Sequence, residues 1–346
     1  MKKTARYLVS FLLAAGLLWF VFKDIDLASM KERMMHADWR WIALSFVLTL
    51  VAHLFRAWRW VMLLRPLDKS VSVYSSFVSL LTGYFANYIL PRMGEVTRCG
   101  TLYRMEGVPV NQSLGTVLAD RIFDVLMLAI LLMLNFFLEF DRLSTFFSGL
   151  IGDKIGGAGG SANLLALVLV GGGLVLIAGG ILIWKNEKVR ERILSVGLFR
   201  KIADFGVGML DGLLSVRKLE RPGLFILATL GIWISYYFSS FAIFFCIPET
   251  SQLGWLAGLT VLVIGAVGMT APTQGGIGAY HLLVGNVMVL YGLSQQDGIT
   301  LATFIHGSQM ILMLVVGAIA FLLVLLHQSD ASKKNERLER GIENKI

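Results

Sequence analysis

Long apolar runs constrain this chain more than any other feature of its sequence. Six of them reach the length of a membrane-spanning helix, which needs about 20 mostly apolar residues. The chain is also 56% hydrophobic and 16% charged, with a mean hydropathy of +0.72, whereas soluble domains average about 25% charged residues. The sequence therefore predicts an all-α polytopic membrane protein, whose full spans are residues 4–22, 41–64, 111–138, 161–184, 222–246 and 298–327.

Two further apolar stretches contain helix breakers. Residues 73–90 end at Pro91, and residues 253–292 are cut by Pro272 and a glycine cluster. Irregular backbone inside a bilayer persists only where protein or water satisfies its polar groups. Each stretch is therefore predicted to be a broken, re-entrant helix pair that enters and leaves the membrane on one side. The predicted architecture is about six full spans plus two such pairs.

The distribution of basic residues supports this topology. With the N-terminus inside, the predicted cytoplasmic segments hold 22 of the 31 lysines and arginines, and the outer segments hold 6. Cytoplasmic loops of membrane proteins carry such an excess. A simple crossing at either broken stretch would invert every later loop and remove most of the bias. We expect a multi-pass protein of the bacterial cytoplasmic (inner) membrane with both termini in the cytoplasm, and no nucleic-acid partner despite the net charge of +8.

The predicted segments occur twice in the same order, with opposite orientation. The first repeat covers about 41–138 and the second about 222–327, and both Pro91 and Pro272 begin a Pro-x-x-Gly motif. Inverted repeats of this kind are common in transporters. The whole chain, 1–346, is predicted to form a single transmembrane domain with an inverted repeat.

A basic segment, residues 185–221, connects the two repeats. Its apolar residues recur at near-helical spacing among lysines and arginines. This pattern predicts an amphipathic connector on the cytoplasmic face, attracted to anionic lipid. A plain basic linker is the alternative.

Ionisable residues inside the predicted spans are the first functional candidates, because each costs about 2.5–3.5 kcal/mol on insertion scales. Asp120 and Asp124 lie one turn apart on span 111–138, and Arg121 can reach Asp124. Arg56 is predicted to hold a phosphate or to pair with one of these aspartates. Arg59, closer to the end of its span, is expected to extend to the lipid headgroups. The group forms either a polar wall on a translocation path or a buried ion pair that locks helices together.

Charged residues follow the first break and are expected near the inner mouth. Arg92 and Arg98 can receive an anionic headgroup, because arginine matches phosphate in two-point geometry. Glu95 and Arg98 are spaced to pair on one helix face. Asn87, one turn before Pro91, is expected to satisfy carbonyl groups freed by the break. Simple surface charge is the alternative for this cluster.

Glycines begin the half-helix after the second break. Gly275, Gly276 and Gly278 allow close approach of the backbone, and the exposed N–H groups of a helix start favour an anion. Glycines that serve tight helix packing are the alternative. His281 lies on the same half-helix.

Three motifs, "FANYILPRMGEVTR", "LADRIFD" and "APTQGGIGAYH", together resemble the lysylphosphatidylglycerol synthase transmembrane region, a flippase-like family. The resemblance covers roughly residues 5–325. It implies a membrane half like the one that, in bifunctional members, moves an aminoacylated phospholipid made by a separate synthase domain. Only that membrane half is expected here, so the chain itself is not expected to be a lysyltransferase.

The resemblance also implies site residues, one position at a time. Many family members carry an acidic residue where this chain has His281, and Glu is more frequent at the position of Asp120. The implied residues are Asn87, Pro91, Gly94, Glu95 and Arg98 in the first motif, Asp120, Arg121 and Asp124 in the second, and Pro272, Gly275, Gly276 and Gly278 in the third.

The sequence thus predicts a lipid translocase for a phospholipid or another anionic or aminoacylated lipid. Its expected partners are membrane lipids with an anionic headgroup, with a separate lipid-synthesising enzyme or a second copy of the chain as further options. No cofactor or enzymatic activity is expected, because no metal-hydrolase, acyl-transfer or nucleotide motif occurs. One alternative is a membrane-embedded lipid-modifying enzyme in which Asp120 and Asp124 hold a divalent ion. Another is a membrane partner subunit, which recruits a separate lipid synthase or glycosyltransferase through residues 185–221.

Overall fold

The computed structural model describes residues 12, 15–23, 25–67, 71–89, 93–140, 142, 219–271 and 273–343. These residues form helices and, within the described ranges, no strand, which confirms the predicted all-α class. The chain divides into two compact units, residues 1–124 with 219–346, and residues 125–218. The predicted span 161–184 and the connector up to residue 218 lie outside the described residues, as do Pro91, Arg92 and Pro272.

The helices follow the predicted order of long and short segments. Those of the first half are α2 (Leu27–Met35), α3 (Trp39–Leu64), η1 (Arg65–Leu67), α4 (Val73–Ile89), α5 (Gly94–Glu106) and α6 (Val110–Leu138). Those of the second half are α11 (Pro222–Ala242), η3 (Ile243–Cys246), α12 (Trp255–Met269), η4 (Gln274–Gly276), α13 (Ala279–Val289) and α14 (Gln295–Glu343). A long helix, a pair of short helices and a second long helix therefore occur twice, whereas the inverted symmetry and the repeat boundaries remain predictions.

Three helices of the described residues are long and apolar enough to cross a membrane. They are Trp39–Leu64, Pro222–Cys246 and Gln295–Leu326, which match three predicted spans within a few residues. α6 begins one residue before the predicted span 111–138. The number of full spans stays a prediction.

Local sequence signals place the helix ends. The Asp38 carboxylate accepts a hydrogen bond from the backbone N–H of Arg40 at 3.0 Å and so caps the start of α3. Pro222 occupies the first turn of α11, where its missing N–H is not needed. α5 ends at Gly107, whose φ of 69° is in the left-handed region that glycine adopts readily.

The first broken stretch is a helical hairpin. Gly83 of α4 lies against Gly94 and Arg98 of α5, and Ser72, just before α4, donates a hydrogen bond to Glu106 at the end of α5. The two helices are therefore antiparallel, and the break lies at the tip of the hairpin. The structure places Glu95 and Arg98 on a helix that folds back along α4, whereas their predicted place at the inner mouth stays a prediction.

The second broken stretch forms the equivalent pair. Tyr280 of α13 lies against Gly265 and Gly268 of α12, and the hydroxyl groups of Thr260 and Tyr291 are 2.6 Å apart at the other end of the pair. These contacts make α12 and α13 antiparallel. α13 packs in turn on α14, where Gly285 meets Ile299.

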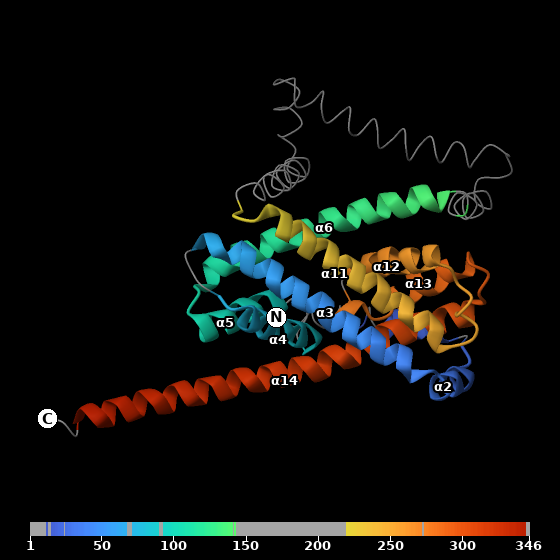
Figure 1. Cartoon of the computed structure of the whole chain (residues 1–346). Coiled ribbons are helices and arrows are strands. Elements are labelled where there is room, and N and C mark those ends of the chain that lie inside the picture. Colours follow the sequence, from blue (N-terminus) through green and yellow to red (C-terminus); the bar gives the residue numbers. More distant parts are fainter. Residues whose placement is uncertain are drawn as a thin grey trace, which may run out of the picture. The chain divides into compact units, whose positions relative to one another are not determined.

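α3 and α11 pack along their whole length in antiparallel directions (Figure 1). Ser45 contacts Ser239 near one end of this interface, and Arg59 contacts Thr229 near the other. α14 continues well beyond the other helices to the C-terminal end (Figure 1).

A buried polar cluster joins α3, α11 and α14 where they meet. Thr49 Oγ1 donates to Gln309 Oε1 at 2.8 Å, and Gln309 Nε2 donates to the hydroxyl oxygens of Ser45 and Ser239, each at 3.0 Å. Thr49 and Ser239 are themselves 2.7 Å apart. Four polar side chains inside apolar helices therefore satisfy one another, as buried polar groups must.

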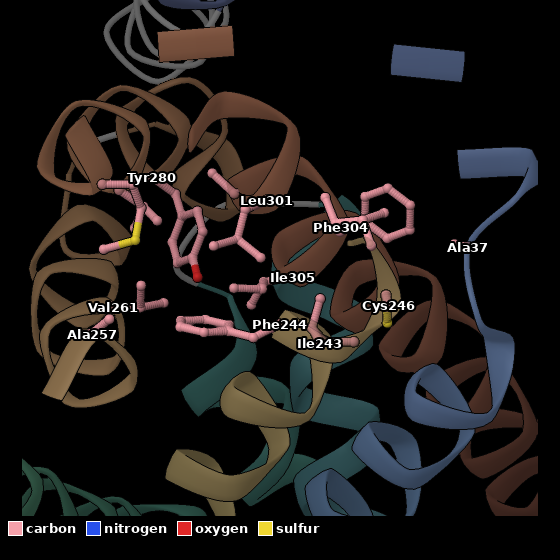
Figure 2. Close-up of a cluster of buried hydrophobic side chains, with 14 of the residues drawn as sticks. Ala37, Ile243, Phe244, Cys246, Ala257, Val261, Tyr280, Leu301, Phe304 and Ile305 are labelled. Carbon is pink, nitrogen blue, oxygen red and sulfur yellow. The ribbon is translucent and has the colours of Figure 1, made fainter. Parts of the chain in front are cut away.

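An apolar core lies mainly among η3, α12, α13 and α14. Figure 2 shows Ala257 and Val261 of α12, Phe244 of η3, and Leu301 and Ile305 of α14 directed toward one another. The core holds the second helix pair against the start of α14. In the second unit, the described residues are 125–140 and 142, and they include an ion pair between Glu139 and Arg142 at 3.2 Å.

Candidate functional site

Seven charged side chains from three helices gather in the first unit. Arg56 and Arg59 are three residues apart on α3, and Asp120 and Asp124 are four apart on α6, so each pair shares a helix face. The remaining members are Arg121 of α6 and Glu95 and Arg98 of α5. We call these seven residues the charged cluster.

Arg59 lies at its centre. Its Nη2 is 2.8 Å from the Asp120 carboxylate and 2.6 Å from that of Asp124, and its Nε donates to Asp120 at 2.9 Å. The expectation that Arg59 extends to the lipid headgroups is therefore wrong, because this side chain has no exposed surface. Its partners are the two carboxylates of α6 and not lipid headgroups.

Arg56 extends the cluster along α3. Its Nη1 donates to Asp124 at 2.7 Å, as the sequence predicted, and its guanidinium lies 5.9 Å from the centre of the Tyr236 ring. Its Nε–H has no hydrogen-bond partner among the described residues although the atom is buried. Arg56 thus has one buried N–H donor that no described residue accepts.

Arg98 enters the cluster from α5. Its Nη1 lies 3.4 Å from Asp120, and its guanidinium stacks on the Trp60 indole at 3.6 Å from the ring centre. Trp60 is held in turn by a 2.9 Å hydrogen bond from its Nε1 to Thr116. Arg98 is buried, and within the described residues its Nε and Nη2 have no hydrogen-bond partner.

Arg121 and Glu95 form the outer end of the cluster. Arg121 Nη2 is 3.0 Å from Glu95, whereas its predicted partner Asp124 is 3.9 Å away. Glu95 therefore pairs with Arg121 rather than with Arg98, the partner that spacing along α5 predicted. The exposed side-chain fraction rises from 0% at Asp120 through 14% at Asp124 to 34% at Glu95 and 40% at Arg121.

The hairpin tip beside the cluster is closed by Asn87. Its Oδ1 accepts a hydrogen bond from the backbone N–H of Gly94 at 2.6 Å. Asn87 thus satisfies an N–H at the start of α5, not a carbonyl as predicted. A side chain at Gly94 would overlap the Asn87 amide, so the motif needs glycine at this position.

The second break forms a separate cluster. Gly275, Gly276 and Gly278 all have positive φ, and His306 lies 2.9 Å from the carbonyl oxygen of Gly275. Apolar atoms of Leu17 and Met269 occupy the space that side chains at Gly278 and Gly276 would need. These contacts support the packing alternative for the glycines more than an anion site.

His281 is buried in this second cluster. Its ring lies 5.1 Å from that of His306 and 5.7 Å from that of Phe22, measured between ring centres. Its Nδ1 has no partner among the described residues. The two breaks approach each other where Gly275 meets the ring of Tyr88. The ring contacts of His281 among the described residues are with Phe22, Tyr280 and His306, which do not belong to the charged cluster.

A family model described as the lysylphosphatidylglycerol synthase TM region matches residues 7–317. The chain belongs to this family. Among curated proteins, it is 25% identical over 126 residues to a UPF0104 membrane protein of Methanocaldococcus jannaschii, a match that covers 36% of each chain. It is 23% identical over 186 residues to a UPF0104 membrane protein of Methanothermobacter thermautotrophicus, which covers 53% of this chain and 49% of the relative. No solved structure matches.

The matched region thus spans about half or less of these curated relatives. Together, the family and the long apolar helices establish a membrane protein of the lysylphosphatidylglycerol synthase TM-region family. In this lysylphosphatidylglycerol synthase TM-region protein, the first two motifs meet in the charged cluster. The third motif, with His281, forms the separate glycine and histidine cluster.

Sequence reasoning missed several parts of the site. Trp60, the platform for Arg98, and Tyr236, the neighbour of Arg56, were not candidates. The Trp60 indole was a usable signal, because guanidinium groups stack on aromatic rings, but its partner is Arg98 of α5 and not the adjacent Arg59. Ser45 and Thr49, four residues apart on α3, likewise marked the polar cluster at the centre of the fold.

Proposed function

We propose that this protein translocates a lipid with an anionic or aminoacylated headgroup across the bacterial cytoplasmic membrane. In this proposal both termini lie in the cytoplasm, and the charged cluster lines the route of the headgroup. The lipid tails stay in the bilayer, and a separate enzyme supplies the lipid.

The observation that carries the proposal is the continuity of the charged cluster from the interior to the surface. Arg59 and Asp120 have no exposed side-chain surface, whereas Arg121 and Glu95, in the same cluster, are exposed by 40% and 34%. A cluster that only locked helices together would not need its exposed end. Ionisable residues within membrane helices typically mark substrate pathways.

The charge balance also supports an anionic substrate. The cluster holds four arginines and three carboxylates, so it carries one excess positive charge. An unbalanced charge in a low-dielectric site is unfavourable unless an ion of opposite sign joins it. A headgroup phosphate, carried in from the bilayer, supplies that charge.

We propose that the chain is not itself a lipid-modifying enzyme. In the metal-dependent alternative, Asp120 and Asp124 would hold a divalent cation. Their oxygens instead lie within ion-pair distance of Arg59, Arg56 and Arg98, which would repel a cation. The alternative of a recruiting subunit depends on residues 185–221, which lie outside the described residues up to 218.

Reconstitution tests the proposal. Purified protein is incorporated into liposomes that contain trace fluorescent lipids, and accessibility of the label to a membrane-impermeant quencher is followed with time. The panel holds phosphatidylglycerol, lysyl-phosphatidylglycerol, phosphatidylcholine and diacylglycerol. We expect faster exchange of one of the first two lipids than in protein-free liposomes. No acceleration for any lipid would reject translocation for this panel.

A further inference from the structure

The charged cluster contains two buried N–H groups of Arg98 that have no acceptor among the described residues. Nε and Nη2 lie side by side on one edge of the guanidinium, and neither has a hydrogen-bond partner among the described residues. Leaving such a donor unpaired is unfavourable, and more so for a charged group. An edge of this kind is stable when an acceptor occupies it.

The edge is held in a fixed orientation. The Trp60 indole covers one face of the guanidinium at 3.6 Å, and the Trp60 ring is fixed by its bond to Thr116. The opposite corner, Nη1, faces Asp120 at 3.4 Å. Asp120 itself is bound more closely by Arg59, at 2.8 Å, so it does not neutralise Arg98 fully.

We infer that the Nε–Nη2 edge of Arg98 binds one tetrahedral oxyanion of the phosphate type. Two parallel N–H donors match two oxygens of such a group, which is the geometry in which arginine binds phosphate. The Nε–H of Arg56, which has no partner within the part of the chain that the structure describes, adds a third buried donor to the same cluster. The negative charge of the ligand balances the one excess positive charge of the cluster.

The phosphate can come from two sources, a lipid headgroup or free inorganic phosphate. The first source rests on the proposed function, whereas the second does not. Arg59 has a different part, because all its ion-pair partners are protein carboxylates and it positions Asp120 and Asp124.

Binding to the full chain in detergent micelles tests the inference. The probes are inorganic phosphate, and dihexanoyl phosphatidylglycerol compared with dihexanoylglycerol, which lacks the phosphate. Thermal stabilisation is measured at constant ionic strength for wild type, Arg98→Lys and Arg65→Lys. Arg98→Lys keeps the charge but removes the two-point edge, whereas Arg65, the matched control, is exposed and paired with Glu220 at 3.0 Å.

We expect Arg98→Lys to weaken phosphate-dependent binding about tenfold to a hundredfold and Arg65→Lys to leave it unchanged. Loss of binding for both phosphate probes assigns a general oxyanion site, and loss for the lipid probe alone assigns a headgroup site. The inference is overturned if neither phosphate probe loses binding in Arg98→Lys. It is also overturned if wild type binds neither probe, or binds dihexanoylglycerol as well as the phospholipid.

Native mass spectrometry of the wild type covers the case in which Arg98→Lys does not fold. Retention of the phospholipid but not of dihexanoylglycerol supports the site without a variant, and equal retention contradicts it. Translocation is measured separately. If the protein binds phosphate through Arg98 but moves no lipid, the inferred site stands and the proposed function is rejected. If it moves lipid but does not bind phosphate through Arg98, only the inferred site is rejected.

Discussion

Arg59 and Asp120 form an ion pair of 2.8 Å in which neither side chain has exposed surface. They belong to α3 and α6, which are far apart in sequence, so the pair connects the first long helix of the first half to its last. Asp120 also lies 3.4 Å from Arg98 on α5. One carboxylate therefore holds three helices of the first half together.

Removing one member of this pair should destabilise the protein strongly. Asp120→Ala leaves the Arg59 guanidinium buried with a weaker set of partners, and breaking a buried ion pair typically costs about 3–5 kcal/mol. We expect a loss of that size in the free energy of unfolding, measured by denaturant titration in detergent micelles.

Two further variants test the cause. In Arg59→Met with Asp120→Leu, apolar groups of similar volume replace both charges, so the part of the loss that comes from the unpaired Arg59 should return. The part that comes from Arg98, which loses the Asp120 carboxylate in both variants, should remain. Arg65→Ala breaks an exposed pair with Glu220 and should change stability by at most about 1 kcal/mol. A double variant that is less stable than Asp120→Ala would show that the pair is not the reason for the loss.

The α4–α5 hairpin predicts opposite effects for two glycine substitutions. A Cβ at Gly83 would lie 2.7 Å from the backbone carbonyl oxygen of Gly94, which cannot move without separating the helices. We expect Gly83→Ala to destabilise the protein by about 1–3 kcal/mol, the usual effect of overpacking. Thermal unfolding in micelles measures the change.

Gly100→Ala is the matched control on α5. Nothing lies within 4 Å of a Cβ at this position, so the substitution should be neutral or stabilise the helix by about 0.5–1 kcal/mol. If both alanine variants lowered the unfolding temperature equally, close contact at the hairpin would not be the cause.

The Gln309 amide should matter for the contact among α3, α11 and α14. Gln309→Leu removes its hydrogen bonds to Ser45, Thr49 and Ser239, and leaves their hydroxyl groups buried with fewer partners. The expected loss is about 1–3 kcal/mol of unfolding free energy. Ser308→Ala, next along α14, removes a hydroxyl that among the described residues donates to the Ile305 carbonyl alone, and should change stability by about 0.5 kcal/mol or less. Equal losses in the two variants would contradict the role of the cluster.

Hydropathy and breaker residues predicted much of the architecture, because the length and polarity of a span are properties of one segment. α3, α6, α11 and α14 begin close to their predicted starts, and both broken stretches form helix pairs. The position of α5 was not predictable in this way. The contacts of Gly83 with Gly94 and Arg98, and of Ser72 with Glu106, show that α5 folds back on α4.

The candidate site was predicted in its residues more than in its pairings. Spacing along one helix suggested Arg121 with Asp124 and Glu95 with Arg98, whereas the close partners come from different helices. Arg59 was assigned to the headgroups because its depth was judged from the end of α3 alone. A carboxylate about sixty residues later in the chain cannot be recognised as its partner without the packing of α6 on α3.

The rate of lipid exchange by the Arg121→Ala variant in liposomes tests most directly the central claim that the charged cluster is a headgroup path. Arg121 is exposed by 40%, so its loss should leave the fold intact, and equal amounts of folded protein can be compared in liposomes. Arg104→Ala, an exposed arginine on α5, serves as control. We predict that Arg121→Ala lowers exchange of the transported lipid to the rate in protein-free liposomes while Arg104→Ala retains the wild-type rate. Wild-type exchange by Arg121→Ala would contradict the account.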